Sequence, residues 1–307
     1  MQNLNEIRQH IRAVEQTRKL TNAMYLVASS RMKRALPHVE YDRMYFKKVE
    51  AAMRDILRSE GSIPHHPYLE DRGDVRCAYI IVAGDKGMAG DYNTAILNLG
   101  WQQAQAHPNP YIVTVGVLAS RFFREKGVVP DREVFGFSQD PSLANARLLM
   151  AQVKDHFDSG DVDKVYLIYT AFFSTVFSRP TVRQILPLSI PGAAAPGVAA
   201  PGTAAPGAGA GIAKEVEASP MLYHPSPKQV FDHLVPEYMV SVLFAALVQS
   251  YASEHCARMN AMRGATDSAD GMLKKLRQEY NLARQAAITR EITEISGAAQ
   301  ALRLESV

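Results

Sequence analysis

The hydrophobic pattern of the C-terminal part of the chain predicts one long helix. From Glu237 to about Leu304 there is no proline, and Gly264, Gly271 and Gly297 are the weak points. At about 1.5 Å per residue such a helix is roughly 100 Å long, several times the average for a globular domain. The core of this one chain is too small to cover a rod of that length. We therefore expect a partner helix, a surrounding assembly, or both.

The N-terminal segment predicts the first partner helix. Its seam positions alternate in steps of three and four, the spacing of a left-handed coiled coil. They are Leu4, Ile7, Ile11, Val14, Arg18, Thr21, Tyr25, Ala28, Met32, Ala35 and Val39. The same alternation continues in the C-terminal segment through Met262, Thr266, Ala269, Leu273, Leu276 and Tyr280. We predict a long antiparallel coiled coil of the two terminal helices, with Arg18 and Tyr25 at the edge of its seam.

The seam changes phase after Tyr280. The next apolar positions follow steps of four before they reach Ile288, Ile292, Ile295, Ala299 and Leu302. Such a stutter locally unwinds a supercoil, so we expect the tip to leave its partner helix and to face another surface. Ordinary helix packing would produce the same apolar positions.

Between the two helices the pattern changes to alternating strands and helices. We predict strands at Cys77–Ala83, Tyr111–Val117, Glu133–Phe137, Lys164–Val176 and Thr181–Leu188, the last two joined by a turn at Ser178, Arg179 and Pro180. Helical segments are predicted up to His107 and over Arg121–Lys126 and Ser142–Phe157. The fold class is therefore α/β, with a largely parallel Rossmann-like domain inserted into the coiled coil.

An Ala/Pro/Gly-rich segment separates this domain from the C-terminal helix. Pro-Gly recurs at 191, 196, 201 and 206, and the stretch from Pro191 to Gly211 has no charged or aromatic residue. Such a composition predicts a flexible insertion outside the mechanism. The predicted segments are the N-terminal helix 1–60, the α/β domain 74–190, the insertion 191–220, and the foot with the C-terminal helix 221–307.

The charge is small in total but unevenly placed. The net charge is +3, yet Arg8 to Arg34 carries seven basic residues against the single acid Glu15. The C-terminal helix adds further cations, which predicts an acidic partner surface. The two cysteines, Cys77 and Cys256, predict no disulfide framework and favour a reducing compartment. The first residues form a charged helix rather than a signal peptide, and the apolar run Tyr238–Val248 is too short to span a bilayer.

Candidate chemistry is sparse. The turn Gly84–Gly90 follows a strand and precedes a helix, but its glycines fit neither dinucleotide nor P-loop spacing, which favours a tight packing turn. His65 and His66 lie with Glu70 and Asp71 in a proline-flanked loop, where we expect solvated side chains rather than a metal site. No nucleophile–base set is visible, although spacing alone leaves a spatial triad open. We expect no catalytic residue, cofactor or metal.

Three segments resemble the gamma subunit family of the F-type ATP synthase. They are NEIRQHIRAVEQTRKLTNAMYLVASSRMKRA (5–35), the turn GDKGMAGDYN (84–93) and the long stretch from ASEHCARMN to SGAAQAL (252–302). The resemblance implies a non-catalytic central-stalk rotor whose coiled coil turns inside a ring of alpha and beta subunits and whose foot rides on a membrane c-ring. It also implies an epsilon partner and a peripheral location on the cytoplasmic face of the bacterial cell membrane, with membrane contact only through the c-ring.

The resemblance also assigns candidate contact residues. Arg284 and Gln285 match residues that catch a beta-subunit loop, and Thr289 and Glu291 match further polar positions of that contact. Met24 and Arg258 align with positions near an acidic lever of the beta subunits, and Ile288, Ile292 and Ile295 are expected to face an apolar bearing. Apart from Arg284 and Gln285, each polar residue is equally compatible with a solvated charged face.

The foot and the glycine-rich turn depart from the family pattern. Tyr223 and His224 match a run near the c-ring, but histidine replaces the usual acid, which puts the local charge pairing in doubt. In the turn, Ala89 stands where the family usually has cysteine, which argues against a thiol switch.

Two other classes of protein remain open from the residues alone. A basic coiled coil beside an α/β domain is compatible with a scaffold or a nucleic-acid-binding protein, which would bind DNA with a steep salt dependence. A nucleotide-binding enzyme using the Gly84–Gly90 turn would bind nucleotide as an isolated chain. We predict neither nucleic acid nor nucleotide as a partner.

Overall fold

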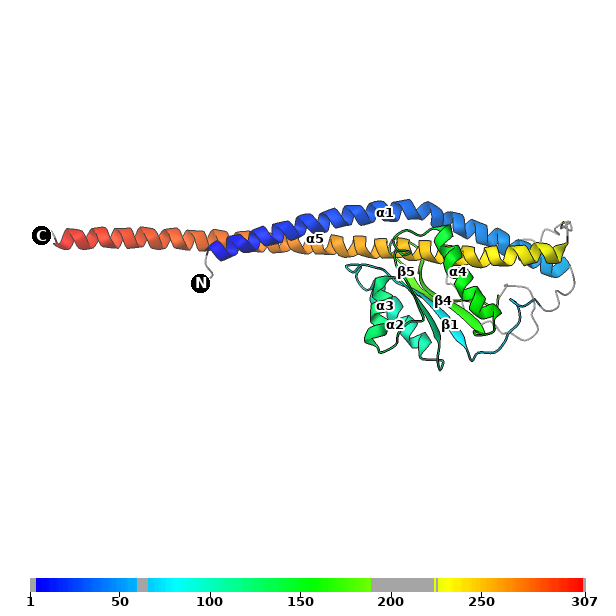
Figure 1. Cartoon of the computed structure of the whole chain (residues 1–307). Coiled ribbons are helices and arrows are strands. Elements are labelled where there is room, and N and C mark those ends of the chain that lie inside the picture. The colour runs from blue at the N-terminus through cyan, green and yellow to red at the C-terminus, as the bar shows by residue number, and fades with distance from the viewer. Residues whose placement is uncertain (1–3, 60–65, 189–223, 225, 306–307) are drawn as a thin grey trace. The chain divides into compact units, whose positions relative to one another are not determined.

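The computed structural model of the chain describes residues 4–59, 66–188, 224 and 226–305 (Figure 1). The predicted insertion 191–220 lies outside the described residues. Within the described part, the long helices are α1 (Leu4–Ser59) and α5 (Pro227–Glu305). The shorter helices are α2 (Tyr92–Ala104), α3 (Val117–Glu125) and α4 (Leu143–Asp158). The strands are β1 (Cys77–Val82), β2 (Tyr111–Val115), β3 (Arg132–Val134), β4 (Lys164–Phe172) and β5 (Ser178–Leu186).

The chain forms two compact units, and each contains part of both long helices. The coiled-coil unit consists of Met1–Lys33, Met88–Asp91 and Glu254–Val307, and the sheet unit consists of Arg34–Gly87 and Tyr92–Ser253. Each unit is made of segments that are separate in the sequence but packed together in the structure. The predicted division at 60, 74, 190 and 220 stays a prediction.

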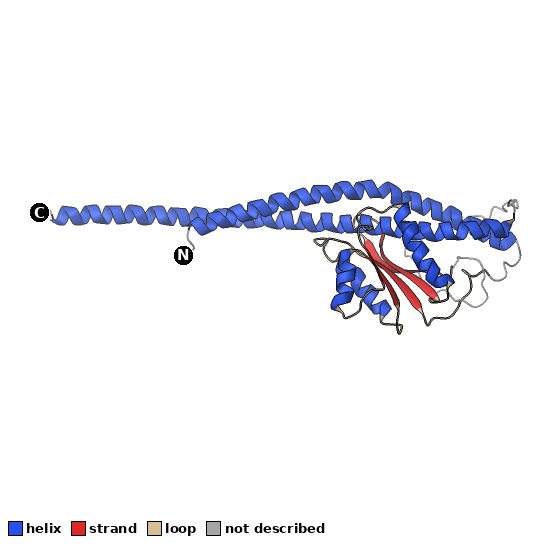
Figure 2. Ribbon diagram, viewed as in Figure 1, coloured by secondary structure: helices blue, strands red, loops and turns tan. Residues whose placement is uncertain are grey.

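The sheet unit is built on a mixed five-stranded sheet in the order β3-β2-β1-β4-β5 (Figure 2). The first four strands are parallel, and β5 pairs antiparallel with β4 at one edge. β1 is the central strand of the sheet, and its side chains point alternately to the two faces. All six of its residues are buried because both faces are covered. The largely parallel α/β sheet expected from the sequence is confirmed.

Helices cover both faces of this sheet. On one face, Ile80 and Val82 of β1 pack with α4 and with the parts of α1 and α5 that belong to the sheet unit. On the other face, Tyr79 and Ile81 of β1 pack with α2 and α3. The sheet unit therefore has three layers and two hydrophobic cores.

The predicted β4–β5 turn is wrong. Ser178, Arg179 and Pro180 belong to β5, where Pro180 pairs with Thr170 of β4. The chain reverses instead at 173–177, where the Phe173 and Ser174 amides donate to the carbonyl of Phe177. Pro180 is tolerated because β5 is the edge strand of the described sheet, so its outer side does not donate hydrogen bonds to another strand of that sheet.

α5 is longer than the hydrophobic pattern predicted, and both long helices contain a proline. α5 begins ten residues earlier than expected and includes Pro236, while α1 runs through Pro37. The start of α5 was hidden by Pro236, although its neighbours Phe231 and Val235 are fully buried in the sheet unit. Packing therefore overrides the helix-breaking tendency of these prolines.

The apolar part of α5 also meets a compositional test for a membrane span. Over Lys228–Ala298 it contains a window that is apolar and long enough, and 56% of that window is buried inside the structure. A helix in the core of a folded domain passes the same test, and Met239, Leu243 and Leu247 of α5 lie in the core of the sheet unit. We read this stretch as a core helix.

Candidate functional site: the coiled coil and its C-terminal tip

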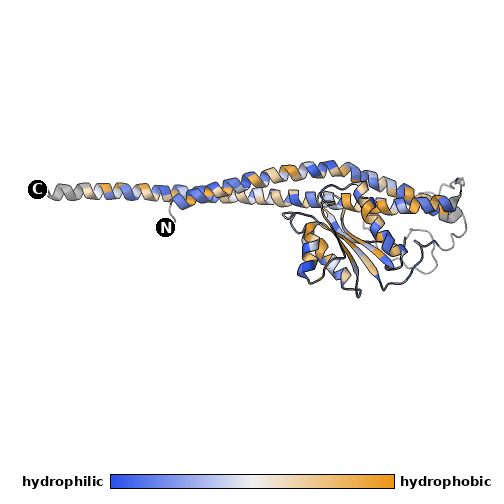
Figure 3. Ribbon diagram, in the orientation of Figure 1, coloured by the Kyte–Doolittle hydropathy of each residue, from blue (hydrophilic) through white to orange (hydrophobic). Residues whose placement is uncertain are grey.

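The predicted seam is confirmed in the coiled-coil unit. Ile7, Ala28 and Met32 of α1 are buried, as are four of the six predicted seam positions of α5. Those four are Met262, Ala269, Leu273 and Leu276. One layer of the seam is polar, because the hydroxyls of Thr21 and Thr266 share a 2.8 Å hydrogen bond. Hydrophilic and hydrophobic residues alternate along both helices in Figure 3, as expected for a seam that takes only one stripe of each helix.

Polar contacts between α1 and α5 show that the two helices run antiparallel. Toward the start of α1, its residues meet progressively later residues of α5. Arg18 pairs with Asp270, Glu15 accepts from Arg277 at 2.8 Å, and Arg8 donates to the Tyr280 hydroxyl at 2.8 Å. Because these pairs are exposed, each contributes about 1 kcal/mol or less. They also use part of the positive charge that the sequence assigned to an acidic partner.

The tip of α5 lies beyond the last of these contacts (Figure 1). From Asn281 to Ala298 every side chain is exposed except Ala283, which is half-buried. Ile288, Ile292 and Ile295 are 44%, 62% and 64% exposed, and Leu282 is 66% exposed. A run of large apolar side chains exposed on a bare helix marks an interaction surface. These are the predicted bearing residues, and their assignment to a bearing stays a prediction.

The predicted catch residues share one side of the tip with the isoleucines. At about 100° per residue, Arg284, Ile288, Glu291 and Ile295 fall on one stripe, and Gln285, Thr289 and Ile292 fall on the adjoining one. Arg284, Gln285, Thr289 and Glu291 are all exposed. The Thr289 hydroxyl donates to the Gln285 carbonyl at 2.9 Å, so the helix itself uses that donor. The helix thus presents a mixed polar and apolar face.

The two predicted lever residues are not exposed. Met24 of α1 is half-buried, and Arg258 of α5 is only 7% exposed. The Arg258 guanidinium donates to the Glu254 carboxylate at 2.6 Å and lies 3.3 Å from Nδ1 of His255. Burial, followed by the charges of Arg258 and Arg31, lowers the pKa of His255 to about 4. The positive charge of Arg258 is therefore balanced by Glu254 of the same chain. The lever contact of Arg258 stays a prediction.

The predicted foot contact is only partly described. Tyr223 lies outside the described residues, and His224 is exposed.

The first two residues of the Gly84–Gly90 turn are hydrogen-bonded to residues outside the turn. In the sheet unit, the Gly84 amide donates to Asn93 Oδ1 at 2.9 Å. The Asp85 carboxylate accepts from the Val117 amide, the Ser138 hydroxyl and the Gln139 amide, each at 2.9 Å. Asp85 therefore joins the turn to the start of α3 and to the segment after β3, as a packing turn would. This arrangement favours the packing turn over a phosphate loop.

One loop histidine differs from its sequence-based expectation, and the other lies outside the described residues. His66 is not solvated but 7% exposed, with Nδ1 accepting from the Tyr68 amide at 3.2 Å and Nε2 lying 3.2 Å from Asp232. Its ring also packs edge-on against Phe231. Phe231 and Asp232 lie far from His66 in the sequence, so the residues next to His66 could not predict its burial. His65 is not among the described residues.

Sequence reasoning also missed a group of three side chains in the sheet unit. Asp74, Cys77 and His107 bring a carboxylate oxygen, a sulfur and a ring nitrogen within 4.8 Å of one another. His107 is thirty positions from Cys77 and falls in no motif with it. Only the path of α2 back to the start of β1 brings the two together.

Comparison with known proteins places the chain in a family. A family model described as ATP synthase matches residues 3–302. An ATP synthase gamma chain of Alkaliphilus metalliredigens is 36% identical over 98% of this chain and 99% of its own length. One of Heliobacterium modesticaldum is 33% identical over 98% of this chain and its whole length.

Solved structures share the fold at much lower identity. A structure of the Euglena gracilis mitochondrial ATP synthase, described as OSCP/F1/c-ring, includes a chain that matches with a TM-score of 0.62. It is 14% identical, and the match covers 97% of this chain and 94% of that one. A central stalk/c-ring chain of Tetrahymena thermophila matches with a TM-score of 0.55 at 19% identity, covering 80% and 99%. Near-complete coverage by relatives above 30% identity settles the family. This chain belongs to the ATP synthase gamma chain family.

Proposed function

We propose that the chain is the central-stalk rotor of an F-type ATP synthase and is itself non-catalytic. In this role it couples ion flow through a membrane c-ring to ATP synthesis or hydrolysis in a ring of alpha and beta subunits. The observation that carries the proposal is the bare tip of α5, which continues the long helix past the start of α1 with its isoleucines exposed. A rotor shaft needs a segment of this kind, because a ring of subunits can surround and contact an exposed single helix.

The two-stranded part of the coiled-coil unit supports the transmission of torque. Interlocking seam residues resist the sliding of one helix on the other, so two helices bend and twist less than one. The Thr21–Thr266 layer adds a polar register mark, because shifting the seam would break this hydrogen bond between two hydroxyls. Torque applied at one end of the pair would then reach the other end with little loss.

The tip supports a contact that forms and breaks during rotation. Its isoleucines would face an apolar sleeve, while Arg284 and Gln285 on the same side would catch a beta-subunit loop. Exposed charge pairs are individually weak and exchange easily, which suits a contact that must be released in every turn. Thr289 and Glu291 complete this polar set.

The remaining contacts follow from the same role. Met24 and Arg258 would lie near the acidic lever of the beta subunits, and Tyr223 and His224 near the c-ring. An epsilon subunit would join the stalk, and membrane contact would occur only through the c-ring, at the cytoplasmic face of the bacterial cell membrane. The role requires no cofactor and no nucleic acid.

The test is a reconstitution of the chain with its cognate alpha and beta subunits and the membrane sector. We expect Arg284→Ala with Gln285→Ala to lower ATP synthesis in vesicles while the complex still assembles. A matched control is Lys275→Ala with Gln278→Ala, an exposed cation and amide on the two-stranded part of α5. Unchanged synthesis in the first variant, or an equal loss in the control, contradicts the catch. The rotor role itself fails if a complex lacking this chain hydrolyses ATP with the same rate and cooperativity.

A further inference from the structure

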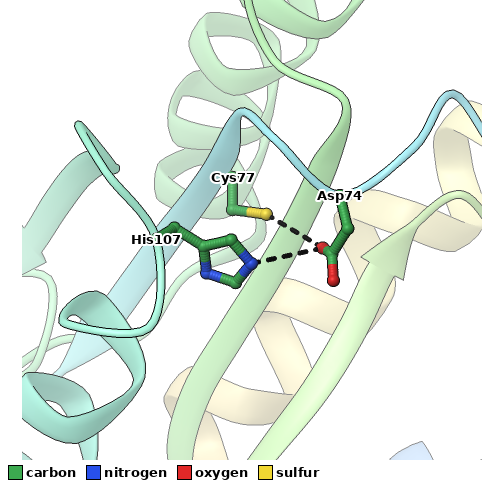
Figure 4. A group of neighbouring side chains, drawn as sticks. All are labelled: Asp74, Cys77 and His107. Carbon is green, nitrogen blue, oxygen red and sulfur yellow. Dashed lines mark hydrogen bonds and ion pairs between the residues drawn. The ribbon is translucent and has the colours of Figure 1, made fainter.

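Three potential metal ligands meet at the start of β1 in the sheet unit (Figure 4). The Cys77 sulfur lies 3.2 Å from Oδ1 of Asp74, and Nε2 of His107 lies 3.4 Å from the same oxygen. Three different elements position them: the loop before β1, the first residue of β1, and the loop after α2. The group is remote in sequence from every residue assigned to the rotor contacts.

The spacing of these atoms matches a tetrahedral zinc site. Zinc holds sulfur at about 2.3 Å and nitrogen or oxygen at about 2.0 Å, so neighbouring ligand atoms lie about 3.3–3.5 Å apart. The two separations in the structure, 3.2 and 3.4 Å, fall close to this range. Both separations end on the same carboxylate oxygen, and all three ligand atoms lie within 4.8 Å of one another, so the three side chains can share one cation.

A further contact orients the histidine. Nδ1 of His107 lies 2.7 Å from the Tyr79 hydroxyl, and Tyr79 stacks on Tyr166 at 5.4 Å between ring centres. A metal-binding histidine ordinarily uses its second nitrogen in a hydrogen bond of this kind, which directs the other nitrogen toward the ion. The hydroxyl of Tyr79 can accept from Nδ1 and leave Nε2 free of a proton.

The site is enclosed by protein but open on one side. Cys77 is 1% exposed, and the side chain of His107 is 15% exposed, whereas that of Asp74 is 53% exposed. An ion can therefore enter past Asp74. A water can complete the coordination on that side.

We propose that Asp74, Cys77 and His107 bind one borderline-soft divalent cation of the Zn²⁺ class. A thiolate and an imidazole favour zinc over magnesium or calcium, which prefer oxygen ligands. On binding, the Cys77 S–H bond breaks, its proton goes to solvent, and the sulfur bonds to the ion. The cation then ties the start of β1 to the loop after α2 and acts as a structural staple.

Lys164 provides an internal test of this assignment. Its ammonium lies 3.5 Å from Oδ1 of Asp74 and 3.7 Å from Asp71. A positive charge so close to the ligands opposes a dication, so removing it should tighten binding. If the group were only a hydrogen-bonded cluster, Lys164→Met would have no effect on metal affinity.

The experiment titrates the full chain, kept reduced with a phosphine, with Co²⁺ as a spectroscopic probe for Zn²⁺. We expect one Co²⁺ per chain, with a thiolate-to-cobalt charge-transfer band and the intense visible bands of tetrahedral cobalt, both removed by equimolar Zn²⁺. Cys77→Ser should abolish the charge-transfer band, whereas Cys256→Ser, which changes the other buried cysteine, should leave it intact. The absence of the band in the unchanged chain, or its survival in Cys77→Ser, overturns the proposal.

A second set of variants covers the case in which Cys77→Ser fails to fold. His107→Gln should weaken Co²⁺ binding at least tenfold and abolish the rise in thermal midpoint that Zn²⁺ gives the unchanged chain. Lys164→Met should tighten binding several-fold. Equal Co²⁺ affinity in His107→Gln and in the unchanged chain contradicts the site.

Discussion

The buried ion pair Glu254–Arg258 of α5 allows a quantitative test of how much a buried charge pair contributes to the stability of the coiled-coil unit. Glu254 and Arg258 have side chains 7% and 9% exposed, with 2.6 Å between Oε1 and Nη2. Replacing Glu254 by glutamine keeps the shape but removes the negative charge that balances the guanidinium. Breaking such a buried pair costs about 3–5 kcal/mol, because a desolvated charge loses its partner. Because glutamine can still accept a hydrogen bond from Arg258, we expect Glu254→Gln to lower the local stability by about 3 kcal/mol, the low end of this range.

The double variant Glu254→Leu with Arg258→Met separates the net contribution of the pair from the cost of removing one of its two partners. Replacing both partners by apolar groups of similar size is often neutral or stabilising. We therefore expect the double variant to cost at least 2 kcal/mol less than the sum of Glu254→Leu alone and Arg258→Met alone, an estimate at the upper range of coupling between neighbours.

Native-state hydrogen exchange of the α5 amides around these residues is the suitable assay. The chain has two compact units that can open separately, so a single global unfolding curve would mix them. A loss of about 3 kcal/mol accelerates exchange through local opening by roughly a hundredfold. An acceleration below about fivefold in Glu254→Gln, or additive losses in the double variant, would refute the reasoning. The result also bears on the lever contact, because Arg258 already donates a hydrogen bond to Glu254.

Three further predictions concern the seam, a turn and pH. Leu273→Ala removes a seam side chain that is 5% exposed and should cost about 2–4 kcal/mol by hydrogen exchange of the neighbouring α5 amides, whereas the exposed Leu282→Ala should change stability by less than about 0.5 kcal/mol. Gly116→Ala should cost more than about 3 kcal/mol, because φ is +100° there and a Cβ would lie 2.3 Å from the Ala83 carbonyl oxygen; a soluble variant with an unchanged unfolding midpoint would contradict this. The pKa of His255 falls in the folded chain to about 4, so the neutral form is favoured there and stability should fall as pH decreases from about 6.5 to 4, by at most about 1.4 kcal/mol per pH unit. His255→Gln should flatten that slope when the opening free energy of the neighbouring α5 amides is measured by hydrogen exchange at several pH values, and an unchanged slope would show that another group is responsible.

Much of the coiled-coil unit could be predicted from the sequence because its contacts are periodic. Steps of three and four place Ile7 and Leu273 on the seam wherever the partner helix lies, and both are buried. The exposed tip after Tyr280 followed from a change of phase in the same period. The family resemblance supplied the catch and lever assignments, which periodicity alone does not contain. It could not show that Arg258 is already paired with Glu254, since that depends on which side of α5 is desolvated.

The sheet unit shows the opposite case. Apolar runs predicted its strands, but the turn before β5 was misplaced. A proline within a strand is acceptable at the edge of a sheet, and a local sequence pattern does not show that β5 is the edge strand. The burial of His66 and the meeting of Asp74, Cys77 and His107 likewise depend on the route of the chain between distant elements.

The amino-acid sequence by itself therefore determined the two long helices, the seam between them and the α/β class, since each rests on a repeat of a few residues. Tertiary structure alone decided which polar groups are buried together, because desolvation and ligand spacing arise where segments far apart in the chain converge.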